Sequence, residues 1–401
     1  MDTQKLLMHD QLALEGFRAK ILLERDIYGL IDLRTKMLGI VGLRWVGKTT
    51  FLLKQRSTCQ NSVYISCDLV GLRWVDFFSL VKEMKDVYDI TTFFLDEIHF
   101  LDEWSWILKN IYDFLDVKVI FSGSSMINIV QWKYDLSRRA VDYTMPIFSF
   151  REYLNITKWL QIRKYGLEEI INNHTQIARD LSNVFSPWLF EKYLDFGQFG
   201  YFYEGGGIES YSMKLENSVK KSIYEDLSQT IDISTENLSK FEKILYFMAH
   251  TATSELSLNS LSKQVWLTVK TMWLYINFLS ELGWIIPIEK YGKLSDTLRK
   301  QQKIYFSNTN ILDCFWHKIN IWNVRETFFV DMLNIEKTYN RKLKLYYKTQ
   351  TDFVVEYDGI VREFEVWVKN KKRSERNIFV IKDDIVIGKN NEIPLWLFWL
   401  V

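Results

Sequence analysis

The chain of 401 residues is 48% hydrophobic, 25% charged and 16% aromatic, which is the composition of a globular protein with two or three domains. Its 4 Pro and 17 Gly exclude a long Pro- or Gly-rich linker and a collagen-like segment. Its net charge of +1 excludes a global field that would attract nucleic acid or membrane, so any contact with a polyanion must come from local patches.

Three features predict where the protein works. The 3 cysteines are odd in number and have no paired metal-ligand spacing, which fits a reducing compartment and no disulfide framework. The amino-terminal residues lack the charged and then apolar pattern of a signal peptide. Apolar runs stay well short of the ~20 residues that a membrane span needs. We therefore expect a soluble, cytoplasmic protein without membrane contact.

Residues 1–155 begin with an amphipathic pattern that predicts a lead-in helix over 11–25. Short apolar runs then alternate with helical patterns. The expected strands are residues 37–42, 62–66, 91–97 and 118–123. The expected helices are residues 48–55, 74–86 and 103–115. This alternation predicts an α/β fold in which helices cover both faces of a parallel sheet.

The rest of the chain divides into three predicted parts. Residues 156–235 are mostly helical and polar with a Gly-rich bend, which is typical of a helical linker or lid. Residues 236–308 predict three helices and two strands around a polar loop, the pattern of a winged-helix domain whose recognition helix would be residues 269–282. Residues 309–401 predict a small α/β domain with a helix from about 325 to 336 and strands at LYYKT, DFVVEYD, REFEVWV and LWLFWLV.

The strongest motif is G-x-x-x-x-G-K-[ST], between the first expected strand and the helix after it. Its glycines let the backbone wrap closely around phosphate oxygens, where N–H groups and the positive end of the helix dipole bind negative charge. We predict that Lys48 reaches the β- and γ-phosphates of ATP and that Thr49 ligates Mg²⁺. The predicted nucleotide-binding residues are Gly42, Leu43, Arg44, Trp45, Val46, Gly47, Lys48, Thr49 and Thr50.

Two carboxylates end the expected strand at residues 91–97. Asp96 would hold Mg²⁺ through its water shell, and Glu97 would polarise the attacking water as general base. Such a pair separates hydrolysing ATPases from nucleotide kinases, so the sequence favours hydrolysis. His99, just beyond, has no partner ligand in the sequence and is interpreted as a loop residue.

Further candidates follow the next expected strand. Ser122, with Ser124 and Ser125, could orient the water or touch the γ-phosphate, or could cap the next helix. Arg139, or its neighbour Arg138, could stabilise transition-state charge in cis or from a neighbouring subunit, or could simply lie on the surface. The predicted catalytic residues are Lys48, Glu97, Ser122 and Arg139.

A family resemblance is carried by the motifs GLRWVGKTT, FFLDEIH, FSGSS and LSRRAVDYTMPIFSFREYL. They resemble archaeal and bacterial ATPases that join an AAA-like P-loop domain to a C-terminal domain of unknown function. The similarity continues through YLDFGQFGYF, KIYFSNTNILDCF, VRETFFVDML and KLYYKTQTDFVVEYDGIVREFEVWVK. It implies an AAA-like ATPase domain, a winged helix and a restriction-endonuclease-like domain in series. The family usually has Gly before its arginine, whereas this chain has Arg138 there, and Arg139 takes the matching place.

The terminal domain departs from an active nuclease at one position. A restriction-type site needs an Asp, then a Glu and a Lys two residues apart on the next strand, so that the acids hold Mg²⁺ and the Lys steadies water and phosphate. Asp352 and Glu365 fit, and Glu326 could add a carboxylate. Trp367 stands at the lysine position, and Lys369 lies about 6–7 Å too far along the strand. We therefore predict an inactive nuclease-like scaffold.

Basic residues near aromatic rings cluster at residues 341–348, 369–376 and 290–303, as expected of a nucleic-acid surface. Residues 309–401 nevertheless hold 15 basic and 13 acidic side chains, and the recognition helix has Lys270 as its one base, which favours a protein interface. The sequence thus predicts a Mg²⁺-dependent ATPase whose C-terminal domains engage double-stranded DNA or a partner protein, and which could form oligomers. The alternatives are a nucleotide-gated signalling or scaffold switch without DNA binding, and an ATP-regulated nuclease.

Overall fold

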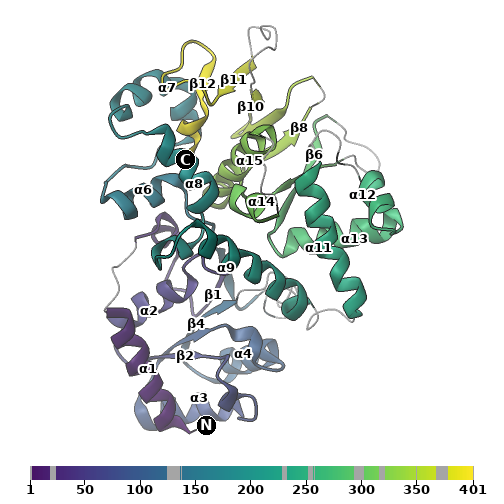
Figure 1. Cartoon of the computed structure of the whole chain (residues 1–401). Coiled ribbons are helices and arrows are strands. Elements are labelled where there is room, and N and C mark those ends of the chain that lie inside the picture. The colour runs from purple at the N-terminus through teal and green to yellow at the C-terminus, as the bar shows by residue number, and fades with distance from the viewer. Residues whose placement is uncertain are drawn as a thin grey trace. The chain divides into compact units, whose positions relative to one another are not determined.

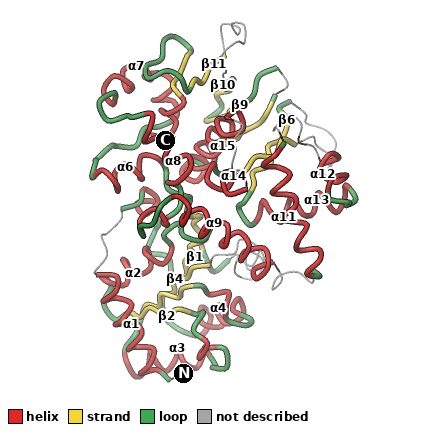
Figure 2. Tube along the Cα trace, in the orientation of Figure 1, coloured by secondary structure: helices red, strands yellow, loops and turns green. Residues whose placement is uncertain are grey.

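The computed structural model describes residues 2–18, 24–123, 136, 138–227, 233–251, 256, 258–292, 302–315, 321–348, 350–366 and 378–400. The chain divides into two compact units, which we call unit 1 (Met1–Pro146) and unit 2 (Ile147–Val401). Figures 1 and 2 trace both units. Within the described residues, no helix combines the length and the apolar character that a membrane crossing requires.

Unit 1 is built on a five-stranded parallel sheet with the strand order β2-β3-β4-β1-β5 (Figure 1). Its strands are β1 (Met37–Val41), β2 (Ser62–Ser66), β3 (Thr92–Asp96), β4 (Lys118–Gly123) and β5 (Val141–Thr144). Its helices are α1 (Thr3–Arg18), α2 (Lys48–Thr58), α3 (Phe77–Tyr88) and α4 (Trp104–Phe114), with 3₁₀ turns η1 (Asp26–Leu30), η2 (Val70–Leu72) and η3 (Ile98–Phe100). The predicted α/β fold with a parallel sheet is confirmed.

The loops that follow β1, β3 and β4 lie at one edge of the sheet of unit 1, because these strands are parallel neighbours in its buried core. Every residue of β3 is buried, and so are the apolar residues of β4 that pair with it. Because these three strands are parallel, their carboxyl ends meet at one edge of the sheet. The glycine-rich loop, the two acids and Ser122 therefore lie at that common edge.

Two features of unit 1 differ from the prediction. The lead-in helix expected over 11–25 is α1, which begins at Thr3 and ends at Arg18. Its buried residues Leu6 and Phe17 are about three helical turns apart and lie on one face, so the amphipathic stripe starts earlier than the prediction had it. The edge strand β5 was not predicted, because its residues are half-buried or exposed and form no apolar run.

Unit 2 contains a seven-stranded mixed sheet with the order β12-β11-β10-β9-β8-β6-β7. Its strands are β6 (Ile285–Lys290), β7 (Gln302–Phe306), β8 (Lys344–Tyr347), β9 (Phe353–Tyr357), β10 (Ile360–Val366), β11 (Ile378–Lys382) and β12 (Glu392–Pro394). Its helices are α6 (Phe150–Lys158), α7 (Leu167–Leu181), α8 (Pro187–Phe196), α9 (Ile208–Lys221), α11 (Thr235–His250), α12 (Leu258–Gln264), α13 (Val269–Glu281), α14 (Thr309–Phe315) and α15 (Ile321–Tyr339).

The helices and strands expected of a winged helix occur in their predicted order as α11, α12, α13, β6 and β7, and β6 pairs with β7 in an antiparallel hairpin. However, β6 also pairs with β8 in parallel, so one sheet continues across the predicted boundary between residues 308 and 309. The separate winged-helix and nuclease-like domains, and the linker at 156–235, stay predictions.

The strand predicted at LWLFWLV is wrong. Residues Leu395–Leu400 form a 3₁₀ helix, η6, and all six side chains are buried. An uninterrupted apolar run is consistent with either a buried strand or a buried helical turn, and periodicity alone does not separate them. The strand β11 was also not predicted, although its first four residues, Ile378–Ile381, are an uninterrupted apolar run.

A buried polar cluster ties together α8, α14 and α15, which belong to three distant motifs of the family resemblance. Gln198 donates from Nε2 to Asp331 Oδ2 at 2.9 Å, and the Asn310 N–H donates to Gln198 Oε1 at 3.0 Å. Asn310 Oδ1 in turn accepts the backbone N–H groups of Gly197 and Gln198 at 3.1 and 2.9 Å. Burial raises the pKa of Asp331 well above its ordinary value, and the hydrogen bond from Gln198 opposes that shift, so the cluster satisfies the polar groups that the fold buries here.

Candidate nucleotide site

The glycine-rich loop runs from Gly42 to Gly47, between β1 and α2. Gly42 has φ 149°, and a Cβ there would lie 2.5 Å from the Met145 carbonyl oxygen. A larger residue would therefore have to displace the backbone that directly follows β5. Gly47 caps α2 with φ 98°, a left-handed conformation that glycine adopts at little cost. The two motif glycines thus stand where the backbone needs them, and the N-terminus of α2 faces the loop.

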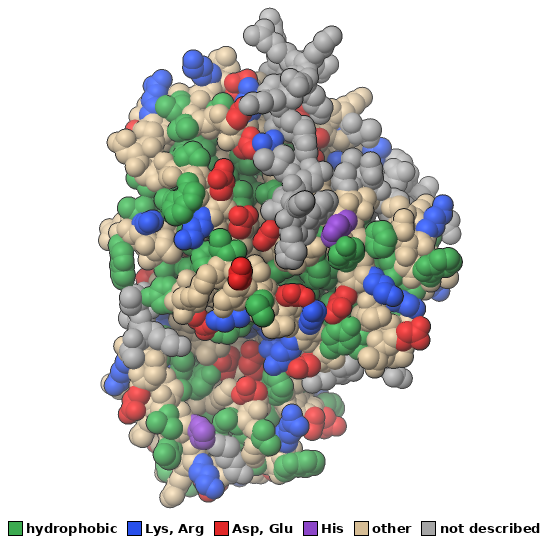
Figure 3. All heavy atoms as spheres, in the orientation of Figure 1, with side chains coloured by type: hydrophobic (Ala, Val, Ile, Leu, Met, Phe, Trp, Pro, Cys, Tyr) green, Lys and Arg blue, Asp and Glu red, His purple; other side chains and the backbone are tan. Residues whose placement is uncertain are grey.

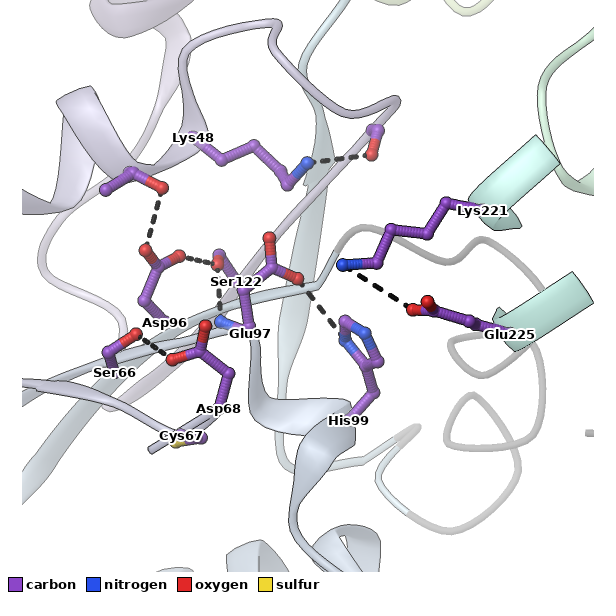
Figure 4. Close-up of polar contacts among 12 residues, drawn as sticks. Lys48, Ser66, Cys67, Asp68, Asp96, Glu97, His99, Ser122, Lys221 and Glu225 are labelled. Carbon is purple, nitrogen blue, oxygen red and sulfur yellow. Dashed lines mark hydrogen bonds and ion pairs between the residues drawn. The ribbon is translucent and has the colours of Figure 1, made fainter. Parts of the chain in front are cut away.

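Lys48 is buried, and its ammonium is held inside the loop. Its Nζ donates to the carbonyl oxygens of Gly42 and Leu43 at 3.0 and 2.7 Å (Figure 4). Oxygen acceptors therefore already surround this positive charge, at the end of a helix whose dipole also favours anions. Phosphate oxygens are acceptors of the same kind, so the loop is suited to them.

Asp96 accepts hydrogen bonds from three hydroxyl groups. Its Oδ2 accepts from Thr49 Oγ1 at 2.7 Å and from the Tyr64 hydroxyl at 2.8 Å, and its Oδ1 accepts from Ser122 Oγ. Burial, followed by the negative charge of Glu97, raises the pKa of Asp96, while the three hydroxyl donors oppose that shift. A buried carboxylate beside a threonine hydroxyl is an oxygen donor pair that suits Mg²⁺.

Glu97 follows at the end of β3 in a left-handed backbone conformation, φ 51°. Its N–H donates to Ser122 Oγ at 3.1 Å, so Ser122 joins both acids from the neighbouring strand β4. Its carboxylate lies 3.5 Å from Nδ1 of His99 (Figure 4). Of the predicted site residues, the structure brings together Lys48, Thr49, Asp96, Glu97 and Ser122.

The other loop residues differ in what they can offer. The side chains of Leu43 and Val46 are buried, so these residues can present only backbone groups to a ligand. Trp45 is exposed and has φ 63°, which is unusual for a bulky side chain. Arg44 and Thr50 are half-buried.

The structure does not bring Arg139 to this edge of the sheet. Arg139 pairs with Asp113 through two hydrogen bonds of 2.8 and 2.9 Å, just before β5 begins at the amino end of the sheet. The phosphate loop follows the carboxyl end of β1, so the geometry is against a role for Arg139 in cis. Ser124 and Ser125 lie outside the described residues.

Several neighbours of the site were not predicted. Arg25 is buried and donates to the carbonyl oxygens of Val46, in the loop, and Pro146 at 2.6 and 3.0 Å. Tyr64 reaches Asp96 from the middle of β2. Asp68 follows β2 and accepts from the Ser66 hydroxyl at 2.5 Å. Arg25 and Tyr64 belong to no local motif, because each contacts a distant part of the chain, whereas Asp68 accepts from a residue two positions before it.

Residues 34–154 match the model of a protein family described as AAA domain. The α/β fold of unit 1, with its parallel five-stranded sheet, agrees with this match. Residues 189–318 match a second family model, described as a domain of unknown function (DUF8612). The first match contains the whole of the loop and both acids, whereas the second leaves the role of unit 2 to be proposed.

One similar protein is the uncharacterized protein MJ1637 of Methanocaldococcus jannaschii, which is 28% identical over 304 residues. The match covers 72% of this chain and 64% of that protein, so it spans just under two thirds of the relative.

Two solved structures were also matched. The S. cerevisiae Hsp104–ADP complex has a TM-score of 0.29 and 16% identity, over 70% of this chain and 40% of that one. Drosophila ORC bound to AT-rich DNA and Cdc6 has a TM-score of 0.23 and 9% identity, over 78% and 94%. Both TM-scores are too low to support an argument about this chain.

The acids predicted for a nuclease-like site lie in and beside the sheet of unit 2. Asp352 Oδ2 accepts the Val366 N–H at 2.9 Å, Glu326 accepts the Tyr305 hydroxyl at 2.9 Å, and Glu365 is buried. Among the described residues, no three His, Cys, Asp or Glu side chains are grouped so that they could hold a metal ion. Trp367 and Lys369 lie outside those residues.

The predicted nucleic-acid surface is described in part. Three lysines of the segment 341–348 pair with acids, namely Lys342 with Asp358, Lys344 with Glu356 and Lys348 with Glu363. The basic residues at 293–300 and 369–376 lie outside the described residues. On α13, the exposed residues are the apolar Val269, Trp273 and Leu274 and the basic Lys270, and Trp266 just before the helix is 91% exposed.

Proposed function

We propose that the protein is a Mg²⁺-dependent ATPase whose AAA domain binds and hydrolyses ATP and whose unit 2 engages a partner protein. The observation that carries the ATPase proposal is the 2.7 Å hydrogen bond between Thr49 of the phosphate loop and Asp96 of β3. This bond connects the phosphate loop to the end of β3, where Glu97 follows Asp96 directly in the sequence.

The residues present fit a magnesium ion. Thr49 Oγ1 and the Asp96 carboxylate would hold it, directly or through water, as oxygen donors of the kind Mg²⁺ prefers. The raised pKa of Asp96 supports this fit, because a nearby cation would compensate the charge that burial disfavours. Bound Mg²⁺ supplies neutralisation of the charge on the β- and γ-phosphate oxygens.

The chain's own residues have separate roles in the proposed reaction. Lys48 and the N–H groups at the start of α2 bind the phosphates and hold the nucleotide. Ser122 orients the strand end through Asp96 Oδ1 and the Glu97 N–H. Glu97 takes the proton of the attacking water as general base. These roles favour hydrolysis over transfer to a metabolite.

The test is ATP turnover, together with equilibrium binding of a fluorescent ATP analogue. Lys48→Ala is expected to lose both by at least about 100-fold, because it removes the ammonium from the phosphate loop. Lys54→Ala is a matched control on the same helix, since Lys54 pairs with Glu24 instead. Wild-type turnover that survives in Lys48→Ala would contradict the proposed site.

The proposal of a partner protein rests on the surface of unit 2. The exposed apolar residues at α13 are Trp266, Val269, Trp273 and Leu274. Exposed aromatic and aliphatic side chains are typical of protein interfaces, whereas DNA-binding surfaces need several basic residues, and Lys270 is the one base of α13. Among the residues that the structure describes, the Lys and Arg side chains on the face in Figure 3 are interspersed with Asp and Glu and form no continuous basic patch there.

A DNA titration separates a protein partner from a DNA partner. We expect ATP turnover to stay within about twofold when duplex DNA is added at low salt. Stimulation that weakens steeply as salt rises would instead assign duplex DNA as the partner, because counterion release makes phosphate contacts salt-dependent. In that case Trp266→Ala would have little effect, since this exposed side chain carries no charge.

A further inference from the structure

We propose that His99 is a positioning residue that holds the carboxylate of Glu97 in place as general base. This inference rests on the proposed ATPase function. The contact that carries it joins His99 Nδ1 and Glu97 Oε2 at 3.5 Å (Figure 4). Glu97 Oε2 is buried and accepts no hydrogen bond within the standard distance and angle limits from the part of the chain that the structure describes.

The backbone brings the two side chains together. Glu97 has φ 51° and ψ 48°, and the 3₁₀ turn η3 (Ile98–Phe100) begins directly after it. The Phe100 N–H donates to the Glu97 carbonyl at 3.1 Å and closes this turn. A left-handed conformation is disfavoured for a non-glycine residue, so a structure that retains it is compensated elsewhere. Here the turn returns the side chain of residue 99 toward that of residue 97.

The imidazole of His99 has little freedom to move away. Its side chain is 2% exposed, whereas the Glu97 side chain is 20% exposed and can reach a ligand. The ring of Phe100 packs against it with ring centroids 4.7 Å apart. A fixed ring beside a partly exposed carboxylate is the arrangement expected of a group that orients a base, since the base itself must contact water.

The charge state of His99 suits this role. Burial, and then the positive charges of Arg44 and Lys48, lower the pKa of His99 to about 3, although Asp96 and Asp68 oppose the shift. The imidazole is therefore neutral at neutral pH. With its proton on Nδ1, it would donate to Glu97 once this contact shortens, without neutralising the carboxylate, which stays a base. At 3.5 Å the contact is long, as catalytic hydrogen bonds often are before substrate binds, and they tighten in the complex.

Two variants separate a hydrogen-bond donor from a packing residue. His99→Leu keeps apolar volume and removes the donor, and His99→Asn keeps an N–H group near the position of Nδ1. We expect His99→Leu to lower kcat by about 10- to 100-fold with KM for ATP within about twofold, because misplacing the base affects the chemical step. We expect His99→Asn to recover most of kcat. His9→Asn is the matched control, since His9 is exposed on α1.

A double-mutant cycle adds a readout that a structural role would not move. In the Glu97→Gln background, His99→Leu should cause no further loss of kcat, because a positioning residue acts through the residue it holds. Equal losses in the two backgrounds, equal losses in His99→Leu and His99→Asn, or a KM increase as large as the kcat loss would each overturn the inference. A wild-type chain that hydrolyses no ATP would overturn the proposed function as well, whereas normal turnover in His99→Leu would overturn this inference alone.

Discussion

Both units place carboxylates at or beside strands, but the groups around those carboxylates differ. In unit 1 the donors to Asp96 are the hydroxyls of Thr49, Tyr64 and Ser122, and a hydroxyl can turn its lone pairs toward a cation when one arrives. In unit 2 a donor to Asp352 is the Val366 backbone N–H, which has no lone pair to offer. The first arrangement can become a metal site, whereas the second fastens the start of β9 to β10.

The largest expected effect compares one acid from each unit. Glu97→Gln should lower ATP turnover by about 10²- to 10⁴-fold while ATP binding is retained, because the general base is lost and the phosphate loop is intact. Glu365→Gln, the same change at a buried acid of unit 2, should leave kcat within about twofold. Steady-state turnover and nucleotide binding of both variants test this.

A plasmid-nicking assay with Mg²⁺ tests whether the acids of unit 2 are catalytically inert, as the comparison of the two units assumes. We expect no nicking by the wild-type chain. Nicking that Glu365→Gln and Asp352→Ala both abolish, and Glu97→Gln leaves intact, would show that the acids of unit 2 form an active centre after all. The two variants in unit 2 would then be the ones with the large effect.

A second prediction concerns the rigidity of the phosphate loop. Arg25→Gln should lower ATP affinity by about tenfold and also lower the melting temperature. The guanidinium joins the Val46 and Pro146 carbonyls, and leaving a buried acceptor without its donor costs about 1–3 kcal/mol. Arg34→Gln is the control, since the side chain of Arg34 is 91% exposed and pairs with Asp32. Isothermal titration and thermal melts measure the two effects, and unchanged affinity in Arg25→Gln would show that the loop holds its shape without this contact.

A third prediction concerns the stability of unit 1 without nucleotide. The pKa of Asp96 is raised in the folded state, so below about pH 4 the carboxyl is protonated in both states and carries no ionisation cost. As the pH rises past that value the unfolded chain loses its proton first, and stability falls until the folded pKa is passed. Asp96→Asn removes this loss. It should raise the melting temperature by about 2–4 °C at pH 7, and the gain should shrink toward pH 4.

The same variant should lose Mg²⁺-dependent turnover, because an amide binds the cation more weakly than a carboxylate does. A melting temperature that falls in Asp96→Asn at pH 7 would mean that the three hydroxyl donors outweigh burial. In that case the carboxylate of Asp96 would stabilise the folded state through its hydrogen bonds, as we infer for Asp352 in unit 2.

Much of the site in unit 1 could be predicted from the sequence because its parts are local. The motif around Lys48 and Thr49 specifies a strand, a turn and a helix start, and Asp96 and Glu97 end an apolar strand. Ser122 could be placed at the same edge because parallel strands end together. Arg25 and His99 could not be assigned, because each acts through a side-chain contact that only the folded chain creates.

In unit 2 the element order could be predicted, but the pairing of the strands could not. The winged-helix hairpin could be expected from three helices and two strands, whereas the parallel pairing of β6 with β8 joins residues far apart in the chain. The terminal run of apolar residues has no period that separates a strand from a helical turn. Local patterns thus describe unit 1 better than unit 2, because the alternation of strands and helices predicts the parallel sheet of unit 1, whereas no comparable pattern predicts the parallel pairing of β6 with β8 in the mixed sheet of unit 2.

The smallest expected effect is that of Arg139→Ala. Arg139 pairs with Asp113 at the amino end of the sheet, and both side chains are partly exposed, so the pair contributes little to stability. At low protein concentration, turnover per chain should therefore equal that of the wild type. If Arg139 acts on a neighbouring subunit, wild-type turnover per chain should rise with protein concentration and that of Arg139→Ala should not. A loss of turnover that is independent of concentration would contradict the placement of Arg139, because it would require an arginine in cis where the structure has its partner Asp113 instead.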